Sequence, residues 1–267
     1  MDTIIIRGGG DLATGIAYKL HKAGYRIIIL EIDKPLTVRR AVAFSEAVYE
    51  GENTVEGIKG ILAKNRKDIY KIWDIGAIPV YIDKEGRIIE EIKPLVVIDA
   101  IIAKRNLGTN KSMAPITIGI GPGFEAGKDV DFVVESNRGT NLGKIIHSGR
   151  ASKNTGIPGE VMGYTQGRVL RAPCDGIVKA FCKIGDIIDK GNVICQVGDK
   201  NVIAPFKGIL RGMIREGLYV NKGLKIGDID PRCIKEYAFI ISDKARIIGD
   251  RVLEGIQITS HLRCQAP

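Results

Sequence analysis

Aromatic residues are scarce in this chain: they make up 6% of its 267 residues, and Trp occurs once. Stacking platforms for single-stranded nucleic acid depend on such rings, so the composition argues against that class of binding protein. The net charge is +9, but Lys and Arg are scattered and form no recognition motif. We therefore expect no nucleic-acid partner. The basic excess is either a solvated surface or part of a site for an anionic, phosphate-bearing small molecule.

Cysteine pairs and long apolar runs are missing as well. The five Cys include no C-x-x-C pair, which argues against a metal site of the zinc type. Their odd number, and the lack of a signal segment at the start, indicate reduced thiols in a cytoplasmic protein. No apolar run reaches the length of a transmembrane helix, so we expect no membrane partner.

The first residues of the chain predict a strand, a tight turn, a helix and a second strand. Residues 3–6 are apolar and β-branched, as is typical of a buried parallel strand, and glycines occupy positions 8–10. Apolar residues then recur at helical spacing until Gly24, and residues 26–31 form a second buried run. This pattern predicts an α/β domain with a Rossmann-like parallel sheet.

The turn Gly8-Gly9-Gly10-Asp11-Leu12-Ala13 matches the pattern G-x-G-x-x-A. In such a turn Gly8 permits the bend, Gly10 lets amides approach a pyrophosphate, and Ala13 lets the helix pack closely on the strand. The helix N-terminus adds partial positive charge. Glu31 ends the second strand, where an acid accepts hydrogen bonds from a ribose diol. Taken alone, this unit points to NAD.

Other polar residues extend the candidate cofactor-binding site. Arg7 is a ligand contact or points to solvent, and Asp11 is a ligand contact or only a helix N-cap. Arg39 and Arg40 form a pair that clamps an anion or lies on the surface. Asp99 ends a further buried run, where it contacts a ligand or caps the next segment.

The middle of the chain is predicted to alternate between regular elements and long loops. Residues 54–76 show helical periodicity, and Asp83-Lys84-Glu85-Gly86 is typical of a hairpin turn between two strands. Buried strands are predicted at residues 95–99, 116–120 and 130–135.

Glycine, Ser, Thr and Asn are frequent between residues 106 and 165. Long glycine-rich loops that alternate with strands favour a functional role. We therefore add Gly121 and Gly123 to the cofactor-binding candidates. His147 lies in the same region, but a lone His is weak evidence for a general base, and the catalytic residues stay unknown.

A repeat occupies the C-terminal part of the chain. Residues 172–177 correspond to residues 204–209, and Gly185 corresponds to Gly217. Each copy is typical of short strands separated by glycine turns. The pattern resembles the barrel-sandwich hybrid of biotinyl and lipoyl domains, which predicts a C-terminal all-β module. Lys200 lacks the sequence context of the modified Lys in those domains, so we favour a structural or docking module.

We accordingly predict three parts. Residues 1–165 form the Rossmann-like α/β domain with its Gly-rich loops, residues 166–231 form the repeat module, and residues 232–267 form a closing helical segment. In that last part, a closing helix is predicted over residues 237–256, with Ile241, Ala245, Ile248 and Val252 on one face.

With these residues assembled, the chain resembles the YqeB family, which is named for the selenium-dependent molybdenum hydroxylase system. The resemblance runs nearly from end to end. Its most specific parts are Arg7-Gly8-Gly9-Gly10-Asp11-Leu12-Ala13-Thr14-Gly15, Arg39-Arg40 with residues 43–51, Gly121-Pro122-Gly123-Phe124 with Ala126-Gly127, Asn154-Thr155-Gly156 with Pro158-Gly159, and Ser242-Asp243-Lys244-Ala245-Arg246.

The resemblance implies a role in enzyme maturation. Members accompany molybdenum hydroxylases that carry a labile selenium atom, and they are distantly similar to XdhC-type chaperones, which deliver molybdenum cofactor to xanthine dehydrogenase. The implied partner is the hydroxylase apoprotein, and the implied ligand is the molybdenum cofactor or a nucleotide form of it.

Three functions stay open from the sequence. The first is an accessory protein that binds the molybdenum cofactor for insertion or selenylation, and a phosphate-binding turn with nearby Arg suits such an anion. The second is an NAD-dependent oxidoreductase, which Glu31 favours. The third is a docking protein without catalysis. A homo-oligomer is compatible with each of the three.

Overall fold

The chain forms two units, and each is built from separate stretches of sequence. In the computed structural model, unit 1 comprises Met1–Pro35, Phe44–Asn154 and Ile241–Pro267, and unit 2 comprises Leu36–Ala43 and Thr155–Ile240. The structure describes residues 2–154, 156 and 159–265.

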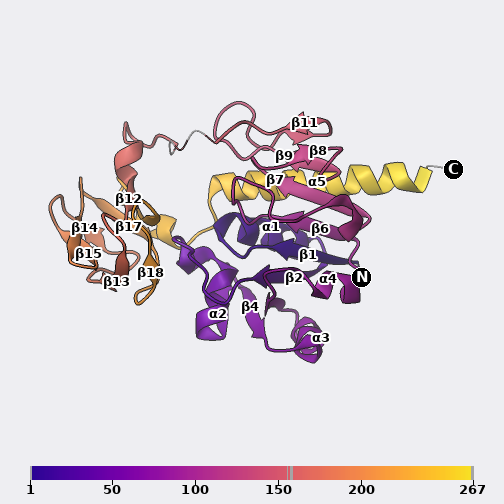
Figure 1. Ribbon diagram of the computed structural model, residues 1–267, viewed down its shortest axis with the longest axis horizontal. Coiled ribbons are helices and arrows are strands. Elements are labelled where there is room, and N and C mark those ends of the chain that lie inside the picture. Colours follow the sequence, from indigo (N-terminus) through magenta and orange to yellow (C-terminus); the bar gives the residue numbers. More distant parts are fainter. Residues whose placement is uncertain (1, 155, 157–158, 266–267) are drawn as a thin grey trace. The chain divides into compact units, whose positions relative to one another are not determined.

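A mixed sheet of nine strands is the centre of unit 1 (Figure 1). Its strand order is β10-β9-β7-β6-β1-β2-β5-β4-β3. Neighbours from β9 to β4 are parallel, whereas β3 and β10 pair antiparallel at the two edges. The strands are β1 (Thr3–Arg7), β2 (Arg26–Glu31), β3 (Glu52–Val55), β4 (Ile58–Ala63), β5 (Ile78–Ile82), β6 (Val96–Asp99), β7 (Ile116–Ile120), β9 (Phe132–Val134) and β10 (Ile145–Ile146), with β8 (Glu125–Ala126) and β11 (Gly149–Arg150) in a small separate sheet.

Helices cover both faces of this sheet, which explains why its central strands are apolar at successive positions. Ile4, Ile5 and Ile6 of β1 are all fully buried. The side of Ile5 packs with α3 (Arg66–Asp74) and α4 (Ile88–Ile92). The other face carries α1 (Asp11–Lys22) and the long α5 (Asp243–Gln265), which pack on one another (Figure 1). Short helices are α2 (Ala47–Glu50), η2 (Phe44–Glu46) and η3 (Lys111–Met113).

The contact between α1 and α5 depends on small residues. A Cβ added to Gly15 would lie 2.7 Å from the Cβ of Ala245, and one added to Gly249 would lie 2.9 Å from the carbonyl oxygen of Gly15. Lys19 and Asp250 form an ion pair of 2.6 Å at the same contact. The two helix backbones therefore approach closely, because the residues at their crossing point are small.

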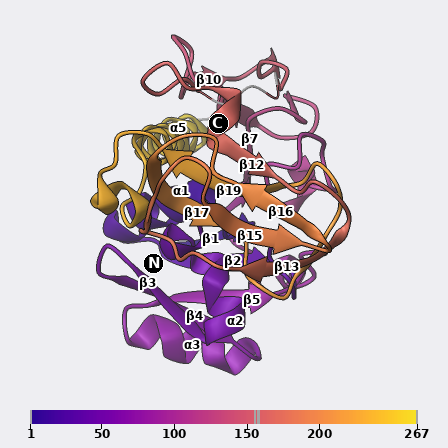
Figure 2. The same cartoon turned by 90° about the vertical axis from the view of Figure 1, so that its left-hand side faces the viewer.

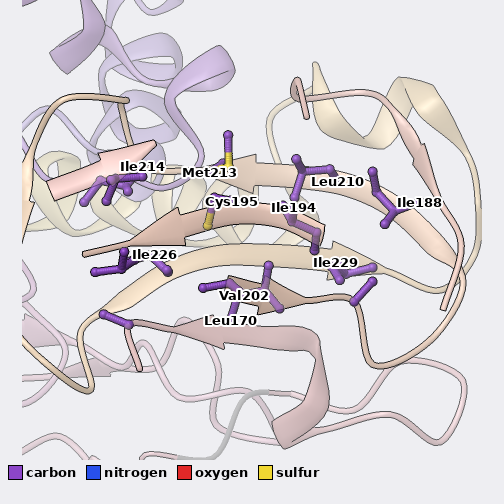
Figure 3. Packing of buried hydrophobic residues seen from close by; sticks show 14 of the residues in the cluster. Leu170, Ile188, Ile194, Cys195, Val202, Leu210, Met213, Ile214, Ile226 and Ile229 are labelled. Atoms are coloured by element: carbon purple, nitrogen blue, oxygen red, sulfur yellow. The ribbon is translucent and has the colours of Figure 1, made fainter. Parts of the chain in front are cut away.

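Unit 2 consists of two four-stranded antiparallel sheets around one apolar core. Their orders are β12-β19-β17-β14 and β16-β15-β13-β18. Figure 2 shows strands of both sheets. Leu210, Cys195 and Ile194 are fully buried in this core (Figure 3). The elements are η1 (Arg40–Val42), η4 (Gln166–Arg168), β12 (Val169–Arg171), β13 (Gly176–Ala180), β14 (Ile187–Ile188), β15 (Val193–Val197), β16 (Lys200–Ile203), β17 (Gly208–Met213), β18 (Tyr219–Val220), β19 (Lys225–Asp230) and η5 (Lys235–Ala238).

The predicted fold class is wrong. A Rossmann-like parallel sheet with a biotinyl- or lipoyl-like barrel-sandwich hybrid was expected, but unit 1 has a large mixed sheet and unit 2 has two antiparallel sheets. The antiparallel edge at β3 arises because residues 52–63 form a hairpin that reverses at Glu56 and Gly57, both with positive φ (47° and 83°). The strand, helix and parallel strand expected at the N-terminus are present as β1, α1 and β2.

Two local predictions are also wrong. The helix expected over residues 54–76 is confined to α3, because its first part is the β3–β4 hairpin. The hairpin expected around residues 83–86 is instead a turn that leads from β5 into α4. The carboxylate of Asp83 accepts hydrogen bonds from the amides of Gly86 (2.9 Å) and Ile88 (2.8 Å), which stabilises the start of that helix.

Other elements are confirmed. The strands expected at residues 95–99, 116–120 and 130–135 are β6, β7 and β9, and the closing helix is α5. Ala245, Ile248, Val252 and Ile256 are its fully buried residues. Within the described ranges, no helix is both long enough and apolar enough to span a bilayer.

Candidate functional site

Three neighbouring parallel strands end together and place functional groups at one edge of the sheet. Arg7, the last residue of β1, pairs in register with Leu30 of β2 and with Asp99 of β6. A pocket of about 430 Å³ opens at this edge. Ligand sites of parallel sheets lie at the carboxyl ends of their strands. The pocket is lined by Arg7, Gly8, Leu30, Glu31, Ile32, Asp83, Lys84, Glu85, Ile101 and Leu107.

Arg7 is buried (3% exposed) and fixes two loops around the pocket. Its guanidinium donates to the hydroxyl of Thr109 (2.5 Å) and to the carbonyl oxygens of Lys84 (3.3 Å) and Leu107 (3.4 Å). It also lies 3.7 Å from the carboxylate of Asp99. The charge of Arg7 is therefore compensated within the protein, and its side chain shapes the pocket wall.

Asp99 is buried beside Arg7 and is fully engaged by the loop that follows β6. Its carboxylate accepts hydrogen bonds from the Thr109 hydroxyl (2.6 Å) and the amide of Ile101 (3.2 Å). Burial raises the pKa of Asp99 above its ordinary value, although Thr109, Ile101 and Arg7 act in the opposite direction. In this structure Asp99 organises the loop and does not line the pocket.

Glu31 lies at the pocket and contacts the glycine turn directly. One of its carboxylate oxygens accepts from the amide of Gly9 and the other from the amide of Ile32, both at 2.8 Å. Burial raises the pKa of Glu31, and these two amide hydrogen bonds partly oppose the shift. A carboxylate has about four acceptor positions, so Glu31 retains capacity for a ligand hydroxyl.

The first two glycines of the turn are covered by the protein's own backbone. Gly8 has φ +94°, and a Cβ there would lie 3.0 Å from the carbonyl oxygen of Ala100. A Cβ on Gly9 would lie 3.0 Å from the amide nitrogen of Ser45, whose amide also donates to the carbonyl oxygen of Gly9 (2.9 Å). Both positions hold glycine because the backbone of another segment passes where a side chain would stand.

The remainder of the turn begins α1. Gly10 is the N-cap, and Asp11, Leu12 and Ala13 form the first turn of the helix. Gly10 and Asp11 are half-buried, whereas Leu12 and Ala13 are buried. The first amides of any helix lack intrahelical acceptors and carry partial positive charge, which favours an anion, while Asp11 adds a negative charge at this end.

The arginine pair lies in unit 2. Arg39 donates to the carbonyl oxygens of Tyr237 and Ile240, both at 3.0 Å, and Arg40 donates to that of Met213 (3.1 Å). These contacts connect residues 36–43 with the end of unit 2. The pair does not line the pocket at Gly8.

The second glycine turn follows β7. Gly121 (φ +74°) packs against the side chain of Ser136, and Gly123 (φ +120°) would place a Cβ 2.8 Å from the amide nitrogen of Arg105. Neither glycine lines the pocket. His147, considered above as a general base, is exposed, and its ring lies 5.8 Å from that of Phe132, also outside this pocket.

Sequence reasoning missed the residues that close the pocket. Leu107 and Ile101 come from the loop after β6, and Lys84 and Asp83 come from the turn after β5. Thr109, from the same loop after β6, does not line the pocket but binds Arg7, which does. These residues carry no motif of their own. Their position directly after two apolar runs was the available signal for loops at the carboxyl edge.

The comparisons with known proteins include a relative that matches nearly the whole of this chain. No family model matches the chain. It is 48% identical over 258 residues to "Uncharacterized protein YqeB" of Escherichia coli (strain K12), a match that covers 97% of this chain and 48% of that protein. The chain thus spans about half the length of this relative. The identity supports the resemblance to the YqeB family.

Solved structures give only weak likenesses. An aspartoacylase family protein from Mesorhizobium loti MAFF303099 is 14% identical, with a TM-score of 0.28, over 85% of this chain and 84% of that chain. The ectoine utilization protein EutE (DoeB) from Ruegeria pomeroyi is 9% identical, with a TM-score of 0.25, over 85% of each chain. Likenesses of this size assign neither a common fold nor a common activity.

Proposed function

We propose that unit 1 binds a nucleotide-type cofactor in the pocket at Gly8, and that the protein is an accessory factor for selenium-dependent molybdenum hydroxylases. The ligand we propose is the molybdenum cofactor or a nucleotide form of it, bound for insertion or selenylation. The observation that carries the ligand class is the pocket itself. It joins apolar walls to the carboxylate of Glu31 at the carboxyl ends of β1 and β2.

The walls favour an uncharged heterocyclic ring. Leu30, Ile32, Ile101 and Leu107 supply apolar surface on several sides, and such lining suits the flat faces of a base or a pterin. The volume of about 430 Å³ is within the range of small-molecule sites.

The polar groups favour a hydroxyl and a phosphate beside that ring. Glu31 retains acceptor positions for a ribose hydroxyl, as argued above. The start of α1, which Gly10 caps, carries partial positive charge that would favour a phosphate attached to the sugar, although of the glycine turn only Gly8 lines the pocket. The place of the protein in hydroxylase maturation, and the hydroxylase apoprotein as its partner, come from the family resemblance.

Calorimetric titration with isolated molybdenum cofactor tests this proposal. We expect the native chain to bind and Leu107→Trp to bind at least tenfold more weakly, because the larger ring fills the pocket. Leu107 is 42% exposed, so the substitution leaves the core intact. Leu36→Trp in unit 2, where Leu36 is 45% exposed, is the matched control and should bind as the native chain does. Equal binding by the native chain and Leu107→Trp excludes this pocket.

An NAD-dependent oxidoreductase is the second candidate, and the geometry of Glu31 favours it. An acid at the end of β2 accepts hydrogen bonds from the adenosine ribose of NAD and repels a 2′-phosphate. Fluorescence titration with NADH separates the two functions. Binding of NADH but not of molybdenum cofactor would replace the first proposal with this one.

A further inference from the structure

The segment from residue 100 to residue 107 connects the pocket with both glycine turns. Ile101 and Leu107 line the pocket. The backbone of the segment crosses Gly8 at Ala100 and Ile101, and it crosses Gly123 at Arg105, each within about 3 Å of where a Cβ would stand. The two turns that the sequence suggests as ligand contacts therefore form the surface on which this segment rests.

The backbone of this segment is unusual for its residue types. Ile102 has φ +59° and Lys104 has φ +64°, both in the left-handed region. A β-branched residue is rarely found there, and such conformations cluster at ligand clamps and switch regions. The segment thus holds two residues in a backbone conformation that is costly for their side chains, between two residues that line the pocket.

The segment also differs in charge from the pocket beside it. The residues that line the pocket carry a net negative charge, because Glu31, Asp83 and Glu85 outnumber Lys84 and Arg7, and Arg7 is already paired with Asp99. Lys104 and Arg105 are exposed on the segment. Among the described residues, no ion pair involves either of them.

We propose that residues 100–107 cover the bound cofactor and that Lys104 and Arg105 contact its phosphate groups. This inference rests on the proposed function, because it concerns the ligand of the same pocket. The cover supplies the cations that the pocket walls lack. A side chain at Gly8 or Gly123 would displace the segment from the position that it takes in this structure.

Titration of the full chain with a nucleoside and its diphosphate tests the phosphate contact. Adenosine with ADP, and cytidine with CDP, are the probes. We expect Lys104→Ala/Arg105→Ala to weaken binding of the diphosphate roughly tenfold or more and to leave binding of the nucleoside unchanged. Lys64→Ala/Lys67→Ala removes the same charge from exposed positions of unit 1 outside the pocket and should bind both probes normally.

Each result separates this inference from the proposed function. If the native chain binds and the Lys104→Ala/Arg105→Ala variant binds the diphosphate equally well, the phosphate contact is wrong and the pocket assignment stands. If the variant loses nucleoside and diphosphate to the same extent, the segment only shapes the wall. If the native chain binds none of the four probes or the molybdenum cofactor, both proposals fail.

Limited trypsin digestion tests the covering movement. Trypsin cleaves after Lys104 and Arg105, which are exposed, so we expect cleavage there to slow severalfold at saturating diphosphate. Cleavage at an exposed site elsewhere, such as Lys67, should keep its rate. An unchanged rate at residues 104–105 with bound diphosphate would overturn the cover.

Discussion

Single polar residues at the carboxyl edge of the sheet hold loops in place by binding backbone groups. Glu31, Asp83, Asp99 and Glu135 each follow or end a strand, and each accepts hydrogen bonds from amides of the loop beyond it. An acid at a strand end is therefore ambiguous from sequence. The same residue type serves a ligand or the adjoining backbone, and only the fold decides between them.

Removal of the Thr109 hydroxyl should destabilise the protein. This hydroxyl accepts from Arg7 and donates to Asp99, so Thr109→Val leaves a buried ion pair without its bridge. We expect the free energy of unfolding to fall by about 1–3 kcal/mol in urea titrations. Thr54→Val, at an exposed position of β3, should change it by less than about 0.5 kcal/mol. Equal values for the two variants would contradict the role given to Thr109.

Glu135 should make stability depend on pH. It is 2% exposed, and burial raises its pKa. The hydrogen bonds that it accepts from the amides of Asn137 and Ser152 (2.7 Å each), from the Ser152 hydroxyl and from the Ser136 amide together outweigh that effect, so the pKa lies below its ordinary value of 4.5. A lowered pKa gives stability that is present above pH 4.5 and is lost as the pH falls through the folded-state pKa.

The variant Glu135→Gln isolates this effect. An amide side chain accepts through only one oxygen, so one buried donor loses its partner and stability at pH 7 should fall by about 1–3 kcal/mol. The difference from the native protein should shrink below pH 4.5, as Glu135 becomes protonated. Glu90→Gln, at an exposed position, is the control. A difference that stays constant from pH 7 to pH 3.5 would show that the charge of Glu135 is irrelevant.

Elements with one clear periodicity were predictable, and elements that depend on a turn were not. The buried, largely apolar strands β6 and β7 and the apolar face of α5 can be recognised in the sequence because burial imposes one pattern over several residues. The β3–β4 hairpin was missed because its reversal uses Glu56 in the left-handed region, which a Glu seldom adopts. The antiparallel edge at β3 follows from that turn, so this part of the fold class was missed with it.

The crossing of α1 and α5 should be sensitive to a single methyl group. Gly15→Ala improves intrinsic helix propensity by about 1 kcal/mol, but its Cβ would lie 2.7 Å from the Cβ of Ala245 and 2.9 Å from its carbonyl oxygen. Overpacking of this kind costs about 1–3 kcal/mol, so we expect net destabilisation in thermal unfolding.

The double variant Gly15→Ala/Ala245→Gly serves as the matched test. The double variant removes the Cβ that faces residue 15 but leaves the nearby carbonyl of residue 245. Once the cost of Ala245→Gly alone is subtracted, we expect it to recover part of the stability that Gly15→Ala loses. If the Gly15→Ala variant were more stable than the native protein, the two helices would be able to move apart without cost.

At the scale of the molecule, each unit has its own apolar core and should open on its own. Leu210→Ala removes a fully buried side chain from unit 2 and should cost about 2–5 kcal/mol. In hydrogen exchange, we expect faster exchange in β13, β15 and β17, with the protection of β1 and β6 retained. Ile5→Ala, in the core of unit 1, should produce the reverse pattern. Loss of protection throughout the chain in both variants would show one cooperative unit.

The division of the chain has a consequence for synthesis on the ribosome. The strands of unit 1 are complete by β10, yet α5, whose buried face covers α1, follows all of unit 2 in the sequence. The apolar face of the nascent sheet therefore waits, uncovered, while about ninety further residues are translated, from residue 155 to residue 241. Unit 2 has the whole of its sequence available first. A chaperone that shields apolar surface should matter most in that interval, and a nonsense codon anywhere before α5 should yield an aggregating product.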